Sequence, residues 1–116
     1  MGITQTRGKA GEDLAVAYLA LAGFRIADRN VRLGGVEVDV VADDGPTRVL
    51  VEVRLRTRGD FGGAAATVDR HKRERLARAA RSLEQQGRAR LRVDVVAVDL
   101  TADGARITHY RNAGTE

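Results

Sequence analysis

The sequence predicts an α/β fold in which a central mixed β-sheet is flanked by helices. Three observations favour it: a helical pattern near the N-terminus, two strand-like segments around a tight turn, and a second helical pattern followed by a strongly β-type run. The order helix, strands, helix, strands is typical of helices packed on a sheet. With 116 residues, 43% of them apolar and 31% charged, residues 1–116 are expected to form one domain with loose tails at 1–7 and 112–116.

The first helix is expected over Lys9–Ala22, because Gly23 stands where a helix commonly ends. At about 100° per residue, its apolar side chains fall on two sides. One side carries Ala15, Val16 and Leu19, and another carries Leu14, Tyr18 and Leu21. We therefore expect broad burial, with Glu12 on the inward-facing stripe. Alternatively, Glu12 starts the helix and interacts with its positive end.

A short strand is expected at Phe24–Ala27, leading through 28–30 into 31–33, before Gly34 and Gly35 interrupt the chain. Residues 35–56 then read as two strands joined by turn residues at 43–46. If these strands pair antiparallel about Gly45, residues whose numbers sum to about 91 lie opposite each other.

Carboxylates occupy this hairpin where a core strand would carry apolar side chains. Strand alternation places two sets of residues on opposite faces of each strand. In the first strand these are Val36, Val38 and Val40 against Glu37, Asp39 and Val41; in the second they are Val49, Val51, Val53 and Leu55 against Leu50, Glu52, Arg54 and Arg56. Asp39 then faces Glu52. Because like charges opposite each other destabilise a sheet, this pair predicts a bound cation and a candidate active site.

Hard divalent cations such as Mg²⁺ take oxygen ligands and need only one or two carboxylates from the protein. Arg54 follows Glu52 by two residues on the same expected strand face, where a cation can stabilise developing charge. The chain has no cysteine, which excludes disulfides and thiolate metal sites.

The second helix is expected over Ala66–Gln86, after a glycine-rich connection at 57–66 that we expect to be mobile. Its apolar stripe carries Val68, Leu76, Ala79 and Leu83. Lys72 lies at the centre of that stripe, so its ammonium group either snorkels to solvent or reaches a polar site beside the sheet. An interior strand follows at Leu91–Leu100, with Asp94 as its charged interruption, and an edge strand at Arg106–Arg111.

The chain is basic, with a net charge of +4 and a pI of about 10.3, and arginine greatly outnumbers lysine. Clustered arginines favour phosphate contacts and hence nucleic acid. The residues expected to bind it are Arg56, Arg58, Arg70, Arg73 and Arg75. The alternative is a solvated surface, with Glu74 and Glu84 as partners. No apolar run suggests a signal peptide or a membrane span, which predicts a cytoplasmic protein without a membrane partner.

Several short motifs, in this order and spacing, resemble a known family. They are G-x-x-G-E-x-x-A-x-x-Y-L at 8–19, R-N at 29–30, E-V-D at 37–39, V-E-V-R-x-R at 51–56, F-G at 61–62, V-x-x-x-K at 68–72 and R-V-D-V-V at 92–96. Together they resemble the YraN-like family of small bacterial proteins, over about residues 8–100. That family belongs to the PD-(D/E)xK nuclease superfamily, with a restriction-endonuclease-like fold, and is distantly similar to Holliday junction resolvases.

The resemblance implies that Asp39 and Glu52 bind Mg²⁺ or Mn²⁺, with Glu12 as an accessory acid and Glu37 beside them. The family pattern has lysine where this chain has Arg54, and the usual proline before the first acid is replaced by Val38. Arginine stays protonated, so it can stabilise charge but cannot accept a proton from water. Lys72 is the residue that could supply an ammonium group instead. Resolvase-like proteins also suggest a homodimer, although no sequence feature marks an interface.

Three functions remain open at this stage. The first is a Mg²⁺-dependent endonuclease acting on DNA, including branched or single-stranded DNA. The second, favoured by Arg54, is a nucleic-acid-binding module of the same fold that is catalytically weak or inactive. The third is a structural or protein-interaction role, in which arginines simply neutralise the carboxylates.

Overall fold

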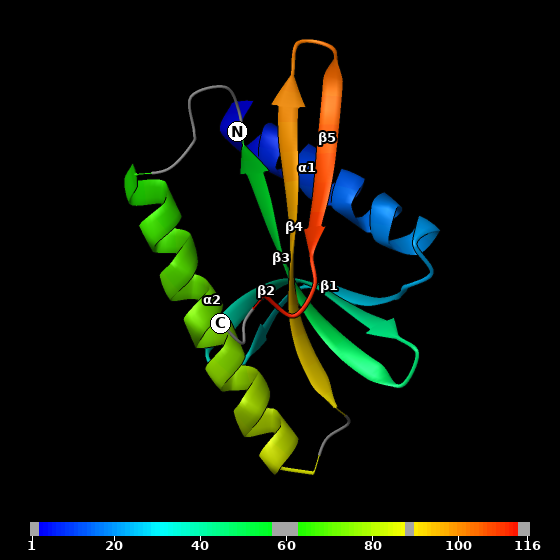
Figure 1. The fold of residues 1–116 in the computed structure, drawn as a ribbon, viewed down its shortest axis with the longest axis vertical. Helices are drawn as coiled ribbons and strands as arrows, with labels where there is room; N and C mark the ends of the chain where they lie inside the picture. The colour runs from blue at the N-terminus through cyan, green and yellow to red at the C-terminus, as the bar shows by residue number, and fades with distance from the viewer. Residues whose placement is uncertain (1–2, 57–62, 88–89, 114–116) are drawn as a thin grey trace.

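The computed structural model describes the backbone of residues 3–56, 63–87 and 90–113, and the side chains of these residues except 3–8 and 63–69 (Figure 1). Its elements, in chain order, are α1 (Ile3–Leu21), β1 (Arg25–Leu33), β2 (Val36–Asp44), β3 (Thr47–Arg56), α2 (Gly63–Gln85), β4 (Leu91–Thr101) and β5 (Gly104–Tyr110).

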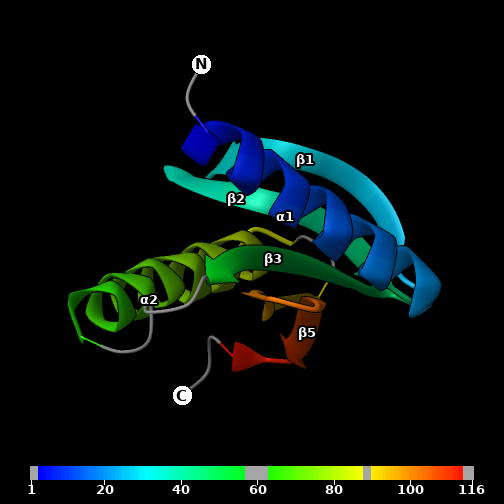
Figure 2. The same cartoon turned by 90° about the horizontal axis from the view of Figure 1, so that it is seen from above.

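The five strands of the described chain form one sheet in the order β1-β2-β3-β4-β5. Neighbouring strands are antiparallel except β3 and β4, which are parallel because α2 carries the chain back across the sheet. The two helices lie on opposite faces of this twisted sheet (Figure 2). The predicted fold class, a mixed sheet flanked by helices, is confirmed.

Each face of the sheet has its own apolar core, built mainly from valine. On the α1 face, Ala15 and Leu19 of the helix pack on Val51 and Val96 of the sheet. On the α2 face, the helix buries Leu76, Ala79 and Ala80 against a second set of strand residues. These strand residues are Val36, Val38, Val41, Leu50 and Val93. Because both faces are covered, the inner strands carry apolar residues at consecutive positions rather than in strict alternation.

The β2–β3 hairpin has the predicted register. Val40 pairs with Val51 and Asp44 with Thr47, so the numbers sum to 91 as expected. Gly45 has a φ of 60°, and Pro46 follows it, a combination that suits a two-residue hairpin turn. The pairing stops at Val40 and Val51, one step before Asp39 and Glu52 would face each other. The two strands therefore separate at the two carboxylates.

Side-chain alternation in β2 changes at this same point. Val38 packs in the α2-face core, whereas Val40 packs in the α1-face core, so the prediction that both share a face is wrong. On the neighbouring strand Asn30 has a φ of 53°, between residues that pair with Val38 and Val40. Asparagine tolerates this left-handed conformation better than most residues. Both strands are thus bent where Asp39 sits.

Several predicted boundaries need correction. α1 begins at Ile3 rather than Lys9, because polar residues without proline extend a helix at little cost once it is nucleated. β1 is one continuous strand with a bulge between Ile26 and Asp28, not a short strand at 24–27. α2 begins at Gly63, so part of the connection predicted to be mobile is helical, while 57–62 lie outside the described residues.

The expected broad burial of α1 is also wrong, since Leu14 is 40% and Leu21 90% exposed. The helix packs on the sheet along one side only. Gly11 sets how closely it approaches, because a Cβ there would lie 3.0 Å from Cδ1 of Leu55 in β3. This close contact brings the next residue, Glu12, to the edge of the space where β2 and β3 separate.

Candidate carboxylate site

Asp39 inserts its side chain between β2 and β3. Its Oδ2 accepts a hydrogen bond from the backbone N–H of Val53 at 2.8 Å, so the carboxylate takes the place of a ladder hydrogen bond. Its Oδ1 faces Lys72 of α2, whose Nζ lies 3.7 Å away. That separation is longer than a direct hydrogen bond, so the ammonium group neutralises Asp39 only in part.

Burial raises the pKa of Asp39 above its ordinary value, because a charged carboxylate loses hydration there. The Val53 N–H and the Lys72 ammonium oppose this rise, whereas the negative charges of Glu12 and Glu37 add to it. Desolvation is thus the largest contribution to the raised pKa, and the Val53 N–H and the Lys72 ammonium offset it only in part.

Glu52 lies on β3 immediately before Val53 and is 2% exposed. Alternation along β3 places it on the α2 face with Leu50, while Val51 and Val53 face α1. Arg54 is two residues further on the same face and is half-buried. The hairpin faces predicted for β3 are therefore correct.

Glu12 is held in a fixed position by two neighbouring residues of β1. Its Oε1 accepts hydrogen bonds from Arg29 at 3.0 Å and from the Asn30 side-chain amide at 2.9 Å. Arg29 also bonds Asp13 at 2.7 Å. The sequence motif Arg29–Asn30 is thus explained by its contacts with Glu12. Since α1 begins at Ile3, Glu12 does not start the helix but lies well inside it, and the alternative in which its carboxylate interacts with the helix's positive end is wrong.

Lys72 points inward, as its place on the apolar stripe of α2 predicted. Its side chain is 27% exposed, and the ammonium group reaches Asp39 rather than snorkelling away from the sheet. Glu37, the predicted additional carboxylate, is exposed on β2 but close enough to raise the pKa of Asp39. Four predicted residues, Glu12, Glu37, Asp39 and Lys72, therefore interact electrostatically at one place.

The donor set of this site suits a hard divalent cation that keeps water and substrate ligands. Asp39 and Glu52 are the two carboxylates that could contribute oxygen ligands, and burial is the main cause of the raised pKa of Asp39. Mg²⁺ commonly uses only one or two protein carboxylates. Among the described residues, no three Asp, Glu, His or Cys side chains form a complete ligand group, so the protein alone does not provide a closed cage.

The predicted nucleic-acid contacts are only partly available at the surface. Arg56 makes a two-point ion pair with Asp99 of β4, at 2.6 and 2.9 Å, so its guanidinium is not directed to solvent as the prediction required. The parallel pairing of β3 with β4 brings these two residues opposite each other. Arg70 and Arg75 are exposed on α2 and Arg73 is half-buried, while Arg58 lies outside the described residues.

A second polar cluster lies on the α1 face, and the sequence did not reveal it. Asp94 is fully buried and accepts hydrogen bonds from Arg92 at 2.8 and 3.0 Å and from the Asn112 N–H at 2.9 Å. His109 Nε2 lies 2.8 Å from Asp94, and His109 Nδ1 lies 2.8 Å from the Tyr18 hydroxyl. The predicted loose tail at 112–116 is therefore wrong at Asn112, which is tied to β4.

Burial alone would raise the pKa of Asp94, but hydrogen bonds from Arg92, the Asn112 N–H and His109 outweigh it and lower the pKa. The signal that could have revealed this cluster was a charged residue inside an apolar strand with an arginine two positions earlier. We name these residues, Tyr18, Arg92, Asp94 and His109, the Asp94 cluster.

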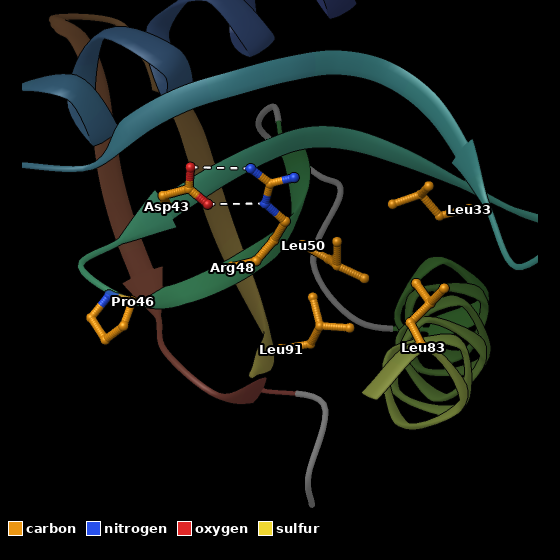
Figure 3. A pocket seen from close by; sticks show the side chains of 7 residues that line it. All are labelled: Leu33, Asp43, Pro46, Arg48, Leu50, Leu83 and Leu91. Carbon is orange, nitrogen blue, oxygen red and sulfur yellow. Dashed lines mark hydrogen bonds and ion pairs between the residues drawn. The ribbon is translucent and has the colours of Figure 1, made fainter. Parts of the chain in front are cut away.

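A pocket of about 330 Å³ lies beside the C-terminal end of α2 (Figure 3). Four leucines line it, together with Pro46 and the Asp43–Arg48 ion pair: they are Leu33, Leu50, Leu83 and Leu91. Arg48 is already neutralised there by Asp43, at 2.9 and 3.2 Å. None of the candidate site residues lines this pocket, so it is separate from the carboxylate site.

These features define an α/β protein whose inner strands separate at a partly buried aspartate that faces a lysine. Residues 11–98 match the model of the uncharacterised protein family UPF0102, and the chain belongs to that family. This confirms the YraN-like family predicted from the motifs. Neither helix in the described part of the chain is long and apolar enough to cross a membrane.

The relatives are bacterial UPF0102 proteins. That of Geobacter sulfurreducens is 43% identical over 110 residues, covering 91% of this chain and 86% of its own. That of Dechloromonas aromatica is 46% identical over 77 residues, and the match spans 66% of this chain and 64% of the relative. Among solved structures, Pyrococcus furiosus SfsA in complex with Ca²⁺ is similar with a TM-score of 0.43 and 18% identity, over 93% of this chain and 63% of that one.

Proposed function

We propose that this protein is a metal-dependent nuclease that cleaves DNA phosphodiester bonds at the Asp39–Glu52 site. The observation that carries the proposal is the position of Asp39. Its carboxylate is partly buried where two strands separate, has a raised pKa, and faces the Lys72 ammonium at 3.7 Å. The resemblance to PD-(D/E)xK nucleases assigns a metal ligand to this same residue.

Asp39 and Glu52 are the residues that would hold Mg²⁺ or Mn²⁺. Such an ion, when bound, lowers the pKa of a coordinated water and stabilises charge on the phosphodiester. Lys72 lies beside Asp39, so it would supply the ammonium group of the family lysine, whose position two residues after Glu52 is taken by Arg54. Glu12, fixed by Arg29 and Asn30, places a second negative charge near Asp39.

A second function, DNA binding without turnover, is favoured by Arg54. Its guanidinium keeps the positive charge of the family lysine but stays protonated and has a larger planar head. In this case the same surface would bind DNA in a salt-dependent manner, because lysine and arginine contacts to phosphates release counterions. Salt-insensitive binding would contradict this alternative.

The test is nicking of plasmid, flap and four-way-junction DNA with Mg²⁺ or Mn²⁺, comparing the wild type with Asp39→Ala. We expect cleavage of at least one substrate by the wild type and none by the variant. Wild-type cleavage that survives Asp39→Ala, or no cleavage of any substrate, would reject the nuclease proposal.

Arg54→Lys distinguishes the two functions in the same assay. If Arg54 alone impairs turnover, the variant restores the family pattern and cleaves faster than the wild type. Arg48→Lys is the matched control, because Arg48 lies on the same strand in an ion pair with Asp43. An equal change in both variants would mean that Arg54 has no particular part in the reaction.

Thermal melting with and without Mn²⁺ addresses the purely structural role. A metal site at Asp39 and Glu52 should raise the melting temperature as the metal concentration rises, because the ion binds only the folded state. The same titration of Asp39→Asn should give a smaller shift. Equal shifts in both proteins would favour a carboxylate cluster without a metal function.

A further inference from the structure

An aromatic residue lies in line with the carboxylate site. Glu52 of β3 pairs with Val95 of β4, and Val95 pairs with Tyr110 of β5. Side chains that pair directly across a sheet lie on the same face, so Glu52 and Tyr110 share the α2 face. Adjacent strands are about 4.8 Å apart, which places the Tyr110 backbone roughly 10 Å from that of Glu52.

Tyr110, at the β5 end of this row, is not covered by the helix, whereas Glu52 and Val95 are buried. α2 packs on β2, β3 and β4, while β5 lies away from it (Figure 1). Tyr110 is 46% exposed, one of three large apolar residues with substantial exposure in the described chain. The other two, Leu14 and Leu21, are on α1 at the opposite face.

Arginines lie next to this set of paired residues on the same face, in the two following rows of residues that pair across β3, β4 and β5. One row consists of Arg54, Ala97 and Thr108, and the following row of Arg56, Asp99 and Arg106. Arg106 is exposed. With one aspartate among three arginines, these two rows carry a positive net charge, which complements a phosphate backbone.

The Tyr110 ring is also restrained. Its hydroxyl interacts with the Arg56 guanidinium, which the two-point ion pair with Asp99 holds in turn. The ring is thus anchored through its backbone in β5 at one end and through its hydroxyl at the other. A restrained ring with an exposed surface loses little conformational entropy when a flat ligand stacks on it.

We propose that Tyr110 stacks on an unpaired base of single-stranded DNA and thereby directs a single-stranded segment toward Asp39 and Glu52. Aromatic rings in a positively charged groove are the usual means by which proteins bind single strands without sequence preference. Paired bases in a duplex do not expose their faces, so the stacking selects DNA with unpaired nucleotides. The claim that the single-stranded DNA is directed toward Asp39 and Glu52 rests on the proposed nuclease function. The stacking on Tyr110 can be measured without cleavage.

The test is a fluorescence-anisotropy titration in EDTA, at low salt, with a labelled thymidine oligonucleotide of about 20 nucleotides and with a duplex of the same length. Tyr110→Ala should weaken single-strand binding about 5- to 150-fold, the range measured for loss of one stacked base. Tyr110→Phe keeps the ring but loses the hydroxyl contact with Arg56, so it should retain most of the single-strand affinity. Tyr110→Leu, which keeps apolar bulk on β5, should behave like Tyr110→Ala. Duplex affinity should change little in all three.

Leu21→Ala is the matched control, since it removes an exposed apolar side chain from the other face and should leave both affinities unchanged. Photocrosslinking with a 5-iodouracil oligonucleotide gives an independent readout, and we expect the crosslinked peptide to contain Tyr110. Wild-type affinity of Tyr110→Leu for the single strand, or crosslinking only to other peptides, would overturn the inference. Tyr110-dependent binding without any cleavage would uphold the stacking and reject the nuclease, and cleavage that depends on Asp39 but not Tyr110 would do the reverse.

Discussion

Asp39 and Asp94 both lie on inner strands of one sheet, Asp39 partly buried and Asp94 fully buried, yet their pKa values shift in opposite directions. Asp94 accepts hydrogen bonds from Arg92, His109 and a backbone N–H, and its pKa is lowered. Asp39 accepts one backbone hydrogen bond, lies 3.7 Å from an ammonium group, and has a raised pKa. The same residue type is fully satisfied at one place and only partly satisfied at the other.

This difference separates structural from functional carboxylates. Buried polar groups normally find their hydrogen-bond partners within the protein, as Asp94 does. A carboxylate that lacks sufficient positive charge is costly, and such groups gather at sites that bind something further. We therefore propose that the Asp94 cluster contributes to stability and that Asp39 takes part in the proposed reaction, and both halves can be tested.

The largest effect is expected from Asp94→Ala. Removing Asp94 leaves His109 without its acceptor and Arg92 with only its ion pair to Asp44, and it should cost about 3–5 kcal/mol in the free energy of unfolding. Urea denaturation measures it. Asp43→Ala is the matched control, because Asp43 binds Arg48 and Arg25 nearer the surface and should cost only about 0–1 kcal/mol. Equal losses in the two variants would show that the Asp94 cluster has no particular part in stability.

A smaller loss in the free energy of unfolding is expected from Tyr18→Phe. The variant removes the hydroxyl that lies 2.8 Å from His109 Nδ1 but keeps the ring that packs edge-on against the imidazole. Loss of one such hydrogen bond should cost about 0.5–1.5 kcal/mol. The urea midpoint should fall accordingly, and an unchanged midpoint would contradict a structural role for the Tyr18 end of the cluster.

The smallest change in stability, with the opposite sign, is expected from Asp39→Asn. A raised pKa means that folding favours the protonated carboxyl, so Asp39 costs stability as the pH rises from its ordinary value of 3.8 through its raised folded value. Below this pH range the asparagine variant should have the same free energy of unfolding as the wild type. At pH 7 its free energy of unfolding should equal or exceed that of the wild type. Asp94→Asn should show the reverse, since the stability from Asp94 is present above 3.8 and is lost as the pH falls through its lowered pKa.

Features set by local chemistry could be predicted from the sequence. The turn at Gly45 and Pro46 determined the hairpin register from Asp44 and Thr47 to Val40 and Val51, but counting residues did not predict the position of Asp39 relative to Glu52, where the strands separate. Helical periodicity alone placed Lys72 on the inward side of α2, and its contact with Asp39 agrees. Both inferences depend only on backbone geometry over a few turns or strand residues.

Features that depend on how distant segments meet could not be predicted. The Asp94 cluster joins α1, β4, β5 and the residues after β5, and nothing in a single segment specifies that meeting. Arg56 was assigned to nucleic acid because the parallel pairing that brings Asp99 beside it arises only through α2. The change of alternation at Asp39 depends on the bend at Asn30, which is a residue of another strand.

The most direct test of the whole account compares two identical substitutions on one strand, Asp39→Asn and Asp43→Asn, in the plasmid-nicking assay with Mn²⁺. Both variants remove one carboxylate from β2, and melting curves establish that each remains folded. We expect Asp43→Asn to nick plasmid DNA at the wild-type rate and Asp39→Asn to be inactive. Equal rates for Asp39→Asn and the wild type would contradict the assignment of Asp39 to catalysis.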